Sequence, residues 1–101
     1  MIEIAKVTGI GEYQEHAHGE KGQDRVFEAP NGKAFAVLRP KTIELRCDRR
    51  LRDLLMERYE TVMESRYFGK GGIEIVPTGQ VQETEIEDLV RLSYNLTVEL
   101  A

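Results

Sequence analysis

Apolar and polar side chains alternate most clearly in the middle of the chain, over residues 42–47. Ile43, Leu45 and Cys47 are each separated from the next by one polar residue. This period of two predicts an antiparallel strand with one buried face and one face in water. The expected water-facing residues are Thr42, Glu44 and Arg46.

Two more strands are expected just before this one, over residues 25–29 and 33–38. Pro30-Asn31-Gly32 separates them, and Asn-Gly favours the positive φ values that a tight hairpin needs. Residues 39–42 predict a second tight turn because they include Pro40. The three strands should therefore follow one another as an antiparallel meander.

A helix is predicted over residues 49–60. Asp48 precedes it and can accept a hydrogen bond from a free N–H of the first turn, as an N-cap does. Apolar side chains then recur at helical spacing. They are Leu51, Leu54, Leu55, Tyr59 and Val62.

A second hairpin is expected after this helix. Residues 62–68 and 73–76 are the predicted strands, and the glycine-rich stretch from Gly69 to Gly72 is the predicted tip. Pro77-Thr78-Gly79 ends the second strand. The glycines around Lys70 do not form a phosphate loop, because no Ser or Thr follows the lysine and a strand follows instead of a helix.

The last helix is predicted over residues 84–98. Thr84 and Glu87 have the spacing of a capping box, in which each side chain bonds a backbone N–H of the first turn. Its expected apolar stripe consists of Ile86, Leu89, Val90 and Leu96.

The N-terminal part is the least regular. Residues 1–7 alternate loosely and predict a short strand. Residues 8–24 are polar and contain four glycines, so they predict a long loop with one helical turn around Glu12 to Ala17. Strands, a helix, strands and a helix in this order indicate an α+β fold. We expect a single domain over residues 1–101, a two-layer sandwich in which two helices cover an antiparallel sheet.

Composition limits the setting. No apolar run approaches the ~18 residues that span a bilayer, so no membrane partner is expected. Charge at Glu3 comes too early for a signal peptide. Cys47 is the single cysteine and excludes an internal disulfide. These features point to the cytoplasm, and a pI near 5.2 argues against a general nucleic-acid coat protein.

Positive charge is concentrated within positions 39–52, which hold six of the fourteen basic residues. Only Glu44 and Asp48 oppose them, so this stretch carries about +4 in a chain of net charge −4. A local positive field of this kind can hold a polyanion even on an acidic protein. The alternative is a solvated face whose arginines pair with nearby acids such as Asp53.

Residues 27–98 resemble the MmcQ/YjbR family. The resemblance lies in Gly32 to Leu38, in Ile43 to Asp48 entering the helix, in Tyr59 to Val62, in Gly69-Lys70 and in Ile86 to Tyr94. It implies a CyaY-like (frataxin-like) α+β sandwich and DNA binding through a "double wing" of two hairpins. The implied wing tips are Arg39-Pro40-Lys41 and Gly69 to Gly72. Residues 1–24 depart from the helix with which that family usually begins.

Three other groups of residues could carry chemistry, namely a histidine pair, a cysteine and a cluster of acids. His16 and His18 would point the same way on a strand and could bind a transition metal with a third ligand. That ligand would come from Glu12, Glu15, Glu20 or Cys47. Their spacing matches no structural zinc pattern, and a solvated pair is the simpler expectation, so no metal site is predicted.

Cys47 lies beside Leu45 on the apolar face, where a thiol behaves as an unreactive hydrophobe. Acids at the start of the last helix could mimic an iron-binding ridge, but the helix dipole alone explains them. They are Glu83, Glu85, Glu87 and Asp88.

No paired acid and base, convincing nucleophile or cofactor loop is present, so neither an enzyme nor a cofactor is expected. The leading hypothesis is a small cytoplasmic protein that binds DNA weakly, mainly through phosphate contacts. The expected contact residues are Arg39, Lys41, Arg46, Arg49, Arg50, Arg52, Arg66 and Lys70.

The second hypothesis is a protein-interaction or structural module. Either an edge strand or the wet sheet face would then pair with another chain. That face would consist of Thr42, Glu44, Arg46 and Glu74. Metal handling by His16 and His18 is the third hypothesis.

Overall fold

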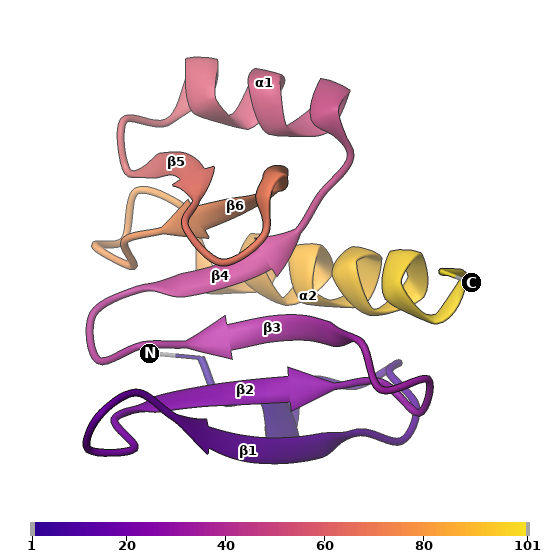
Figure 1. Cartoon of the computed structure of the whole chain (residues 1–101). Helices are drawn as coiled ribbons and strands as arrows, with labels where there is room; N and C mark the ends of the chain where they lie inside the picture. Colours follow the sequence, from indigo (N-terminus) through magenta and orange to yellow (C-terminus); the bar gives the residue numbers. More distant parts are fainter. Residues whose placement is uncertain (1, 101) are drawn as a thin grey trace.

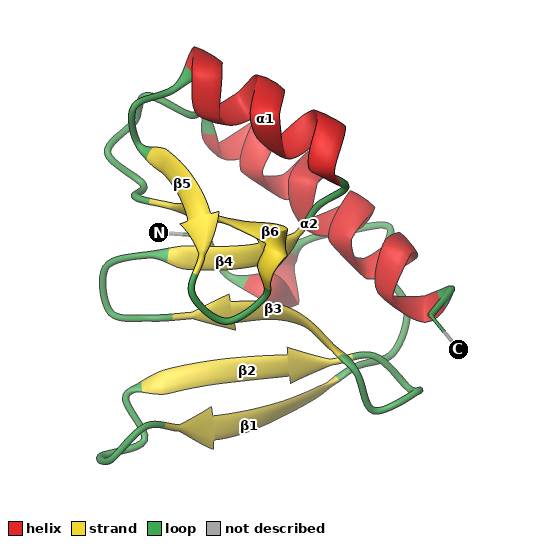
Figure 2. Ribbon diagram, turned by 45° about the horizontal axis from the view of Figure 1, so that its top comes forward, coloured by secondary structure: helices red, strands yellow, loops and turns green. Residues whose placement is uncertain are grey.

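The computed structural model describes residues 2–100, which form one sheet and two α-helices (Figures 1 and 2). The predicted α+β class is confirmed. The elements are the 3₁₀ turn η1 (Ile4–Lys6), β1 (Gln14–His18), β2 (Asp24–Glu28), β3 (Ala34–Leu38), β4 (Ile43–Arg46), α1 (Arg49–Arg58), β5 (Val62–Ser65), β6 (Gly69–Ile75) and α2 (Glu83–Val98).

The sheet has six strands in the order β1-β2-β3-β4-β6-β5, and every neighbouring pair is antiparallel. α2 packs against β3 and β4 from behind in the view of Figure 1, and α1 packs against β5 and β6. Both helices contribute to one core, which is the predicted sandwich. None of the helices described between residues 2 and 100 is long and apolar enough to cross a membrane.

β3 is buried along its whole length and carries a β-bulge. Phe27 pairs with Ala36 whereas Glu28 pairs with Ala34, so Phe35 is the extra residue. The bulge turns both Phe35 and Ala36 toward the core under α2. Val37 lies on the opposite face, in a small cluster with Val26 and Ala34 that Phe68 covers.

The N-terminal predictions are wrong. Residues 4–6 form a 3₁₀ turn rather than part of a strand, and Met1 lies outside the described residues. Ile2, Ile4 and Val7 are buried in the main core, so their spacing reflects packing and not a sheet. The predicted loop at 8–24 contains β1, whose five residues are all exposed and therefore show no apolar alternation.

The first helix begins as predicted. The Asp48 carboxylate accepts a hydrogen bond from the Leu51 N–H at 3.0 Å. Leu55 is buried and Leu51 is half-buried, but Leu54 is 58% exposed instead of joining the apolar stripe. α1 packs mainly against β5 and β6, near the β5 edge of the sheet, so it buries a narrow stripe.

The glycine stretch is not a hairpin tip. Ser65 pairs with Gly69, so the turn consists of residues 66–68, and the glycines belong to β6. Gly72 is needed for close approach: a Cβ there would lie 2.6 Å from both the Leu45 carbonyl oxygen and the Phe68 Cβ. The absence of side chains lets β6 pass between β4 and the turn.

The last helix begins at Glu83, and its N-cap, Gln82, makes no side-chain capping bond. The predicted capping box at Thr84 is therefore wrong. Instead, Glu83 and Glu85 lie in the first turn, where the helix dipole favours acids. The predicted core residues Ile86, Leu89 and Val90 are buried, and Ser93, Tyr94 and Thr97 extend the buried stripe with polar atoms; Leu96 is half-buried.

Candidate nucleic-acid interface

The face of β4 that was expected to lie in water is covered by the β5–β6 turn. Glu44 is 0% exposed. Its carboxylate accepts hydrogen bonds from the Ser65 hydroxyl at 2.6 Å and from the Tyr67 backbone N–H at 2.8 Å. Arg39 also pairs with it. The predicted alternation over residues 42–47 thus assigns each side chain to the correct face of the strand. The face that was expected to lie in water is, however, covered by the turn, and its polar side chains bond to one another and to the turn.

A second buried acid holds the start of the same turn. Glu74 accepts hydrogen bonds from Arg66 Nη2 at 2.6 Å and from the Thr42 hydroxyl at 2.8 Å. Burial by itself would raise the pKa of Glu74, but these hydrogen bonds and the charges of Arg66 and Arg39 together lower it. Glu74 is therefore ionised at neutral pH.

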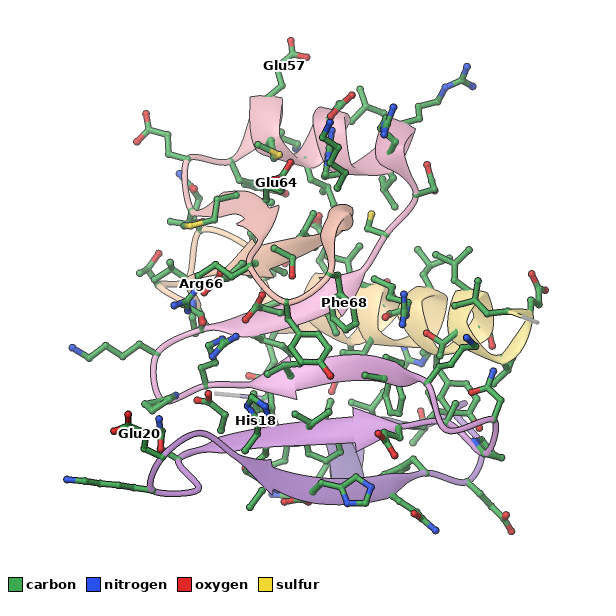
Figure 3. The ribbon with its side chains drawn as sticks, in the orientation of Figure 1. His18, Glu20, Glu57, Glu64, Arg66 and Phe68 are labelled. Carbon is green, nitrogen blue, oxygen red and sulfur yellow. The ribbon has the colours of Figure 1, made fainter. Side chains whose placement is uncertain are left out.

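Arg46 also makes contacts within the folded protein. Its Nε donates to the Ala34 carbonyl oxygen at 2.7 Å, and its guanidinium lies 4.8 Å from the centre of the Phe68 ring. Burial lowers the pKa of this guanidinium, and nearby Tyr67 partly offsets that effect. Figure 3 shows Phe68 in front of the strands, so the turn covers Arg46 from outside.

The basic residues near the two predicted wing tips differ in how many ion pairs they form. The β3–β4 turn and Arg66 line a shared hollow of about 350 Å³. Its three cations are called the turn group: Arg39, Lys41 and Arg66. Arg39 pairs with Asp24 and Glu44, and Arg66 pairs with Glu74. Three acids therefore balance the three cations of the turn group. Among its members, Lys41 forms no ion pair within residues 2–100.

The other basic cluster lies where α1 and β6 begin, and we call it the helix group: Arg49, Arg50, Arg52 and Lys70. Arg52 Nη1 donates to the Lys70 carbonyl oxygen at 2.9 Å, which joins the helix to the strand. Arg52 also pairs with Asp53 and Glu64.

The remaining members of the helix group are solvent-exposed cations. Arg49, Arg50 and Lys70 are exposed and form no ion pair with any described residue between 2 and 100. The first turn of α1 contains no acid of its own, but the Asp48 carboxylate caps it, so the positive end of the helix dipole adds only in part to their field.

β4 separates the two groups. Ile43, which follows the β3–β4 turn, pairs with Ile75, and Arg46 pairs with Gly72 at the other end of the strand. By this register, Lys41 and Lys70 lie beyond opposite ends of β4. The eight predicted cations therefore fall into the turn group with three members, the helix group with four, and Arg46, which the Phe68 ring covers.

Asp24, Tyr67 and Phe68 were not predicted to belong to this region, and Glu74 was expected on a wet sheet face. Asp24 and Glu74 neutralise the turn group, and Phe68, with Tyr67 against its ring, covers the sheet. An aromatic pair such as Tyr67-Phe68 in a predicted turn indicates that the turn packs against other residues, because exposed turns are normally polar. The pairing of Asp24 with Arg39 has no local signal, since it depends on strand register.

The histidines lie on β1 without converging. His16 Nε2 lies 3.0 Å from the Glu28 carboxylate, and the ring of His18 meets Tyr67 edge-on at 6.4 Å. Among the described residues, no group of three or more His, Cys, Asp or Glu could hold a metal ion. Cys47 is buried in the core.

Comparison with known proteins identifies a family. A model of the YjbR family matches residues 10–96, which is most of the chain. The match begins earlier than the resemblance seen in the sequence, and so includes β1 and the segment before it. No curated protein and no solved structure matches the chain.

Proposed function

The chain belongs to the YjbR family, and we propose that it is a non-enzymatic cytoplasmic protein that binds nucleic acid weakly through phosphate contacts. The helix group is the proposed contact surface. The observation that carries the proposal is that Arg49, Arg50 and Lys70 have no ion-pair partner within residues 2–100, in contrast to Arg39 and Arg66 of the turn group.

The electrostatics of α1 support this assignment. Cations in the first turn of a helix are unfavourable by about 0.3–1 kcal/mol each, unless an anion offsets them. A phosphate placed there would meet the side-chain charges of Arg49 and Arg50, beside the Asp48 carboxylate that already caps the first turn. The buried carboxylates are bonded to arginine or hydroxyl partners, which supports binding rather than catalysis.

Binding to a short labelled DNA duplex, followed by fluorescence anisotropy, tests the proposal. We expect a Kd on the order of 10⁻⁵ M at physiological salt. Three neutralised phosphates would give a log–log salt slope of about −2.7, which is roughly a 40-fold loss of affinity between about 50 and about 200 mM salt. Binding that is insensitive to salt would contradict the proposal.

Two triple variants make the test specific. Arg49→Gln, Arg50→Gln and Lys70→Gln together should remove most of the affinity and flatten the salt slope. Lys6→Gln, Lys21→Gln and Lys33→Gln change the net charge equally at lysines outside the helix group. If this control loses as much affinity, the contact is not localised at the helix group and the proposal fails.

The edge strand β1 supports a second candidate function, pairing with another chain. Its five residues are all exposed, and its single neighbour in the described sheet is β2. Light scattering should then show a stable assembly that Ala17→Lys abolishes, because an edge lysine blocks strand addition. A monomer at every concentration, alone and with cell extract, would exclude this function. The alternative in which a water-exposed face of the sheet pairs with another chain is wrong, since Glu44 and Glu74 on that face are buried.

A further inference from the structure

An exposed stripe of α1 carries a leucine between two charges of opposite sign. Leu54 has the largest exposed fraction among the exposed large apolar side chains of residues 2–100. Arg50 lies one turn before it and Glu57 one turn after it, and both are exposed. Figure 3 shows Glu57 pointing out from α1, away from the strands. The three residues follow at intervals of four and three positions, so they lie along one side of the helix.

The same stripe surrounds a hollow of about 490 Å³ on the surface of α1. Its lining residues are Arg49, Arg50, Asp53, Leu54 and Glu57, and all of them belong to this helix. Positions 50, 53, 54 and 57 have the spacing of the four residues that form a hole for a side chain of a facing helix in a coiled coil. The hollow therefore has the arrangement that receives a second helix.

Neither charge of the stripe is neutralised by the chain itself. Arg50 and Glu57 form no ion pair within residues 2–100. They lie seven positions apart, about 10 Å along the helix axis, rather than at the three- or four-residue spacing at which helical charges pair. Asp53, which is closer to Arg50, pairs with Arg52 instead. The stripe thus presents a cation at one end and an acid at the other.

We propose that α1 pairs with α1 of a second copy of this chain, in antiparallel orientation about a two-fold axis beside Leu54. Each Leu54 then enters the hollow of the other copy, as a knob enters a hole. The reversed direction places Arg50 opposite Glu57 of the second copy, since the two residues lie four and three positions from Leu54. Two-fold symmetry repeats this ion pair on the other side of the axis. A parallel pair would instead bring like charges together.

The pairing should be weak. α1 has ten residues and is about 15 Å long, so the contact is smaller than the ~1,200 Å² that stable complexes bury. Exposed ion pairs also add little affinity. We expect a Kd on the order of 10⁻⁴ M. A second copy and a nucleic acid would both use Arg50, so each would exclude the other, but the pairing itself does not depend on nucleic-acid binding.

Sedimentation equilibrium without nucleic acid, over protein concentrations from about 10⁻⁵ to about 10⁻³ M, tests the pairing. Leu54→Ser should weaken the dimer at least about tenfold, because it removes the central apolar contact. Leu92→Ser changes another exposed leucine, on α2, and should leave the dimer unchanged. Ala17→Lys, on the edge strand β1, should also leave it unchanged, which distinguishes this contact from strand pairing. A wild type that stays monomeric, or equal losses in the two leucine variants, would overturn the proposal.

Exchange of the two charges tests the antiparallel arrangement. Arg50→Glu alone sets two acids opposite each other, and Glu57→Arg alone sets two cations opposite each other, so each variant should dimerise at least about tenfold more weakly. An equimolar mixture of these two variants should recover the affinity of the wild type, because opposite charges face each other again. The double variant with both substitutions should recover it by itself. Unchanged dimerisation of either single variant, or no recovery in the mixture, would contradict this arrangement.

Discussion

The carboxylate of Glu44 accepts a hydrogen bond from the backbone N–H of Tyr67 at 2.8 Å, although the two residues are 23 positions apart. Glu44 lies on β4, and Tyr67 lies in the turn between β5 and β6. This bond, together with the ion pair to Arg39, fastens the turn across the face of the sheet. The position of Phe68 over the small apolar cluster depends on it.

Replacing Glu44 by Gln should therefore destabilise the protein. The change keeps the size of the side chain but leaves Arg39 facing a neutral amide, and breaking a buried pair costs roughly 3 kcal/mol. Urea unfolding measures the loss. Glu20→Gln is the control, since Glu20 is exposed in the β1–β2 turn (Figure 3) and should change stability by less than about 0.5 kcal/mol. Equal stability of the two variants would show that Glu44 does not hold the turn.

Stability should fall in acid because of Glu74. Its pKa is lower in the folded protein than its ordinary value of 4.5, through hydrogen bonds from Arg66 and Thr42 that outweigh burial. A lowered pKa stabilises the fold above pH 4.5, and this contribution is lost as pH falls through the folded value. Urea unfolding between about pH 5 and about pH 3 should show a steeper loss for the wild type than for Glu74→Gln. Parallel curves would contradict the assignment.

Two neighbouring glycines should respond differently to alanine. At Gly72 a Cβ would lie 2.6 Å from the Leu45 carbonyl oxygen, whereas at Gly71 the nearest atom is the Phe68 carbonyl oxygen at 3.6 Å. We expect Gly72→Ala to cost about 1–3 kcal/mol, as overpacking does. Gly71→Ala should be neutral or stabilising by about 0.5 kcal/mol. Denaturant midpoints of both variants decide the matter, and similar losses at both positions would refute the close-approach explanation.

Ser93 should be a strong point of attachment for α2. Its hydroxyl accepts from the Arg46 N–H at 2.8 Å and donates to the Phe35 carbonyl oxygen at 2.5 Å. It joins β3 and β4 beside the bulge. Ser93→Ala leaves both backbone groups buried without this partner and should cost about 1–3 kcal/mol in urea unfolding. Asn95→Ala, on the exposed side of α2, should not destabilise.

Cys47 should be unreactive in the folded protein. Burial, with a smaller contribution from the Asp48 charge, raises the pKa of its thiol to about 11. Since the thiolate is the reactive form, labelling with Ellman's reagent at about pH 8 should be slow until denaturant is added. Rapid labelling of the native protein would contradict the expectation that the Cys47 thiol is unreactive.

Local chemistry was sufficient for much of the fold. Asn31-Gly32 and Pro40 predicted both turns of the β2–β3–β4 meander, and Asp48 predicted the start of α1. Each of these signals acts within a few residues, through backbone conformation or a cap. The apolar periodicity of residues 43–47 and 86–90 was likewise correct, because burial on one face leaves a repeat in the sequence.

The errors occurred where a distant segment determines the environment. β1 has no buried face, so it left no alternation to read. Ile2 and Ile4 gave a false alternation, because both fill the core although Ile4 begins a 3₁₀ turn and Ile2 lies just before it. The stretch Gly69 to Gly72 predicted a hairpin tip. In the structure, Gly72 instead allows β6 to lie close to Phe68, because a side chain there would clash. Glycine permits turns and close approach alike, and only the partner distinguishes them.

The order of strands and helices from β2 to α2, the family and the positive charge of residues 39–52 can be read from the chain alone, because they depend on neighbouring residues and on composition. Which cations remain available was decided by the tertiary structure. Strand register placed Asp24, Glu44 and Glu74 against Arg39 and Arg66, while Arg49, Arg50 and Lys70 stayed exposed in the helix group. An ion pair depends on distance in space, and the sequence does not contain that distance.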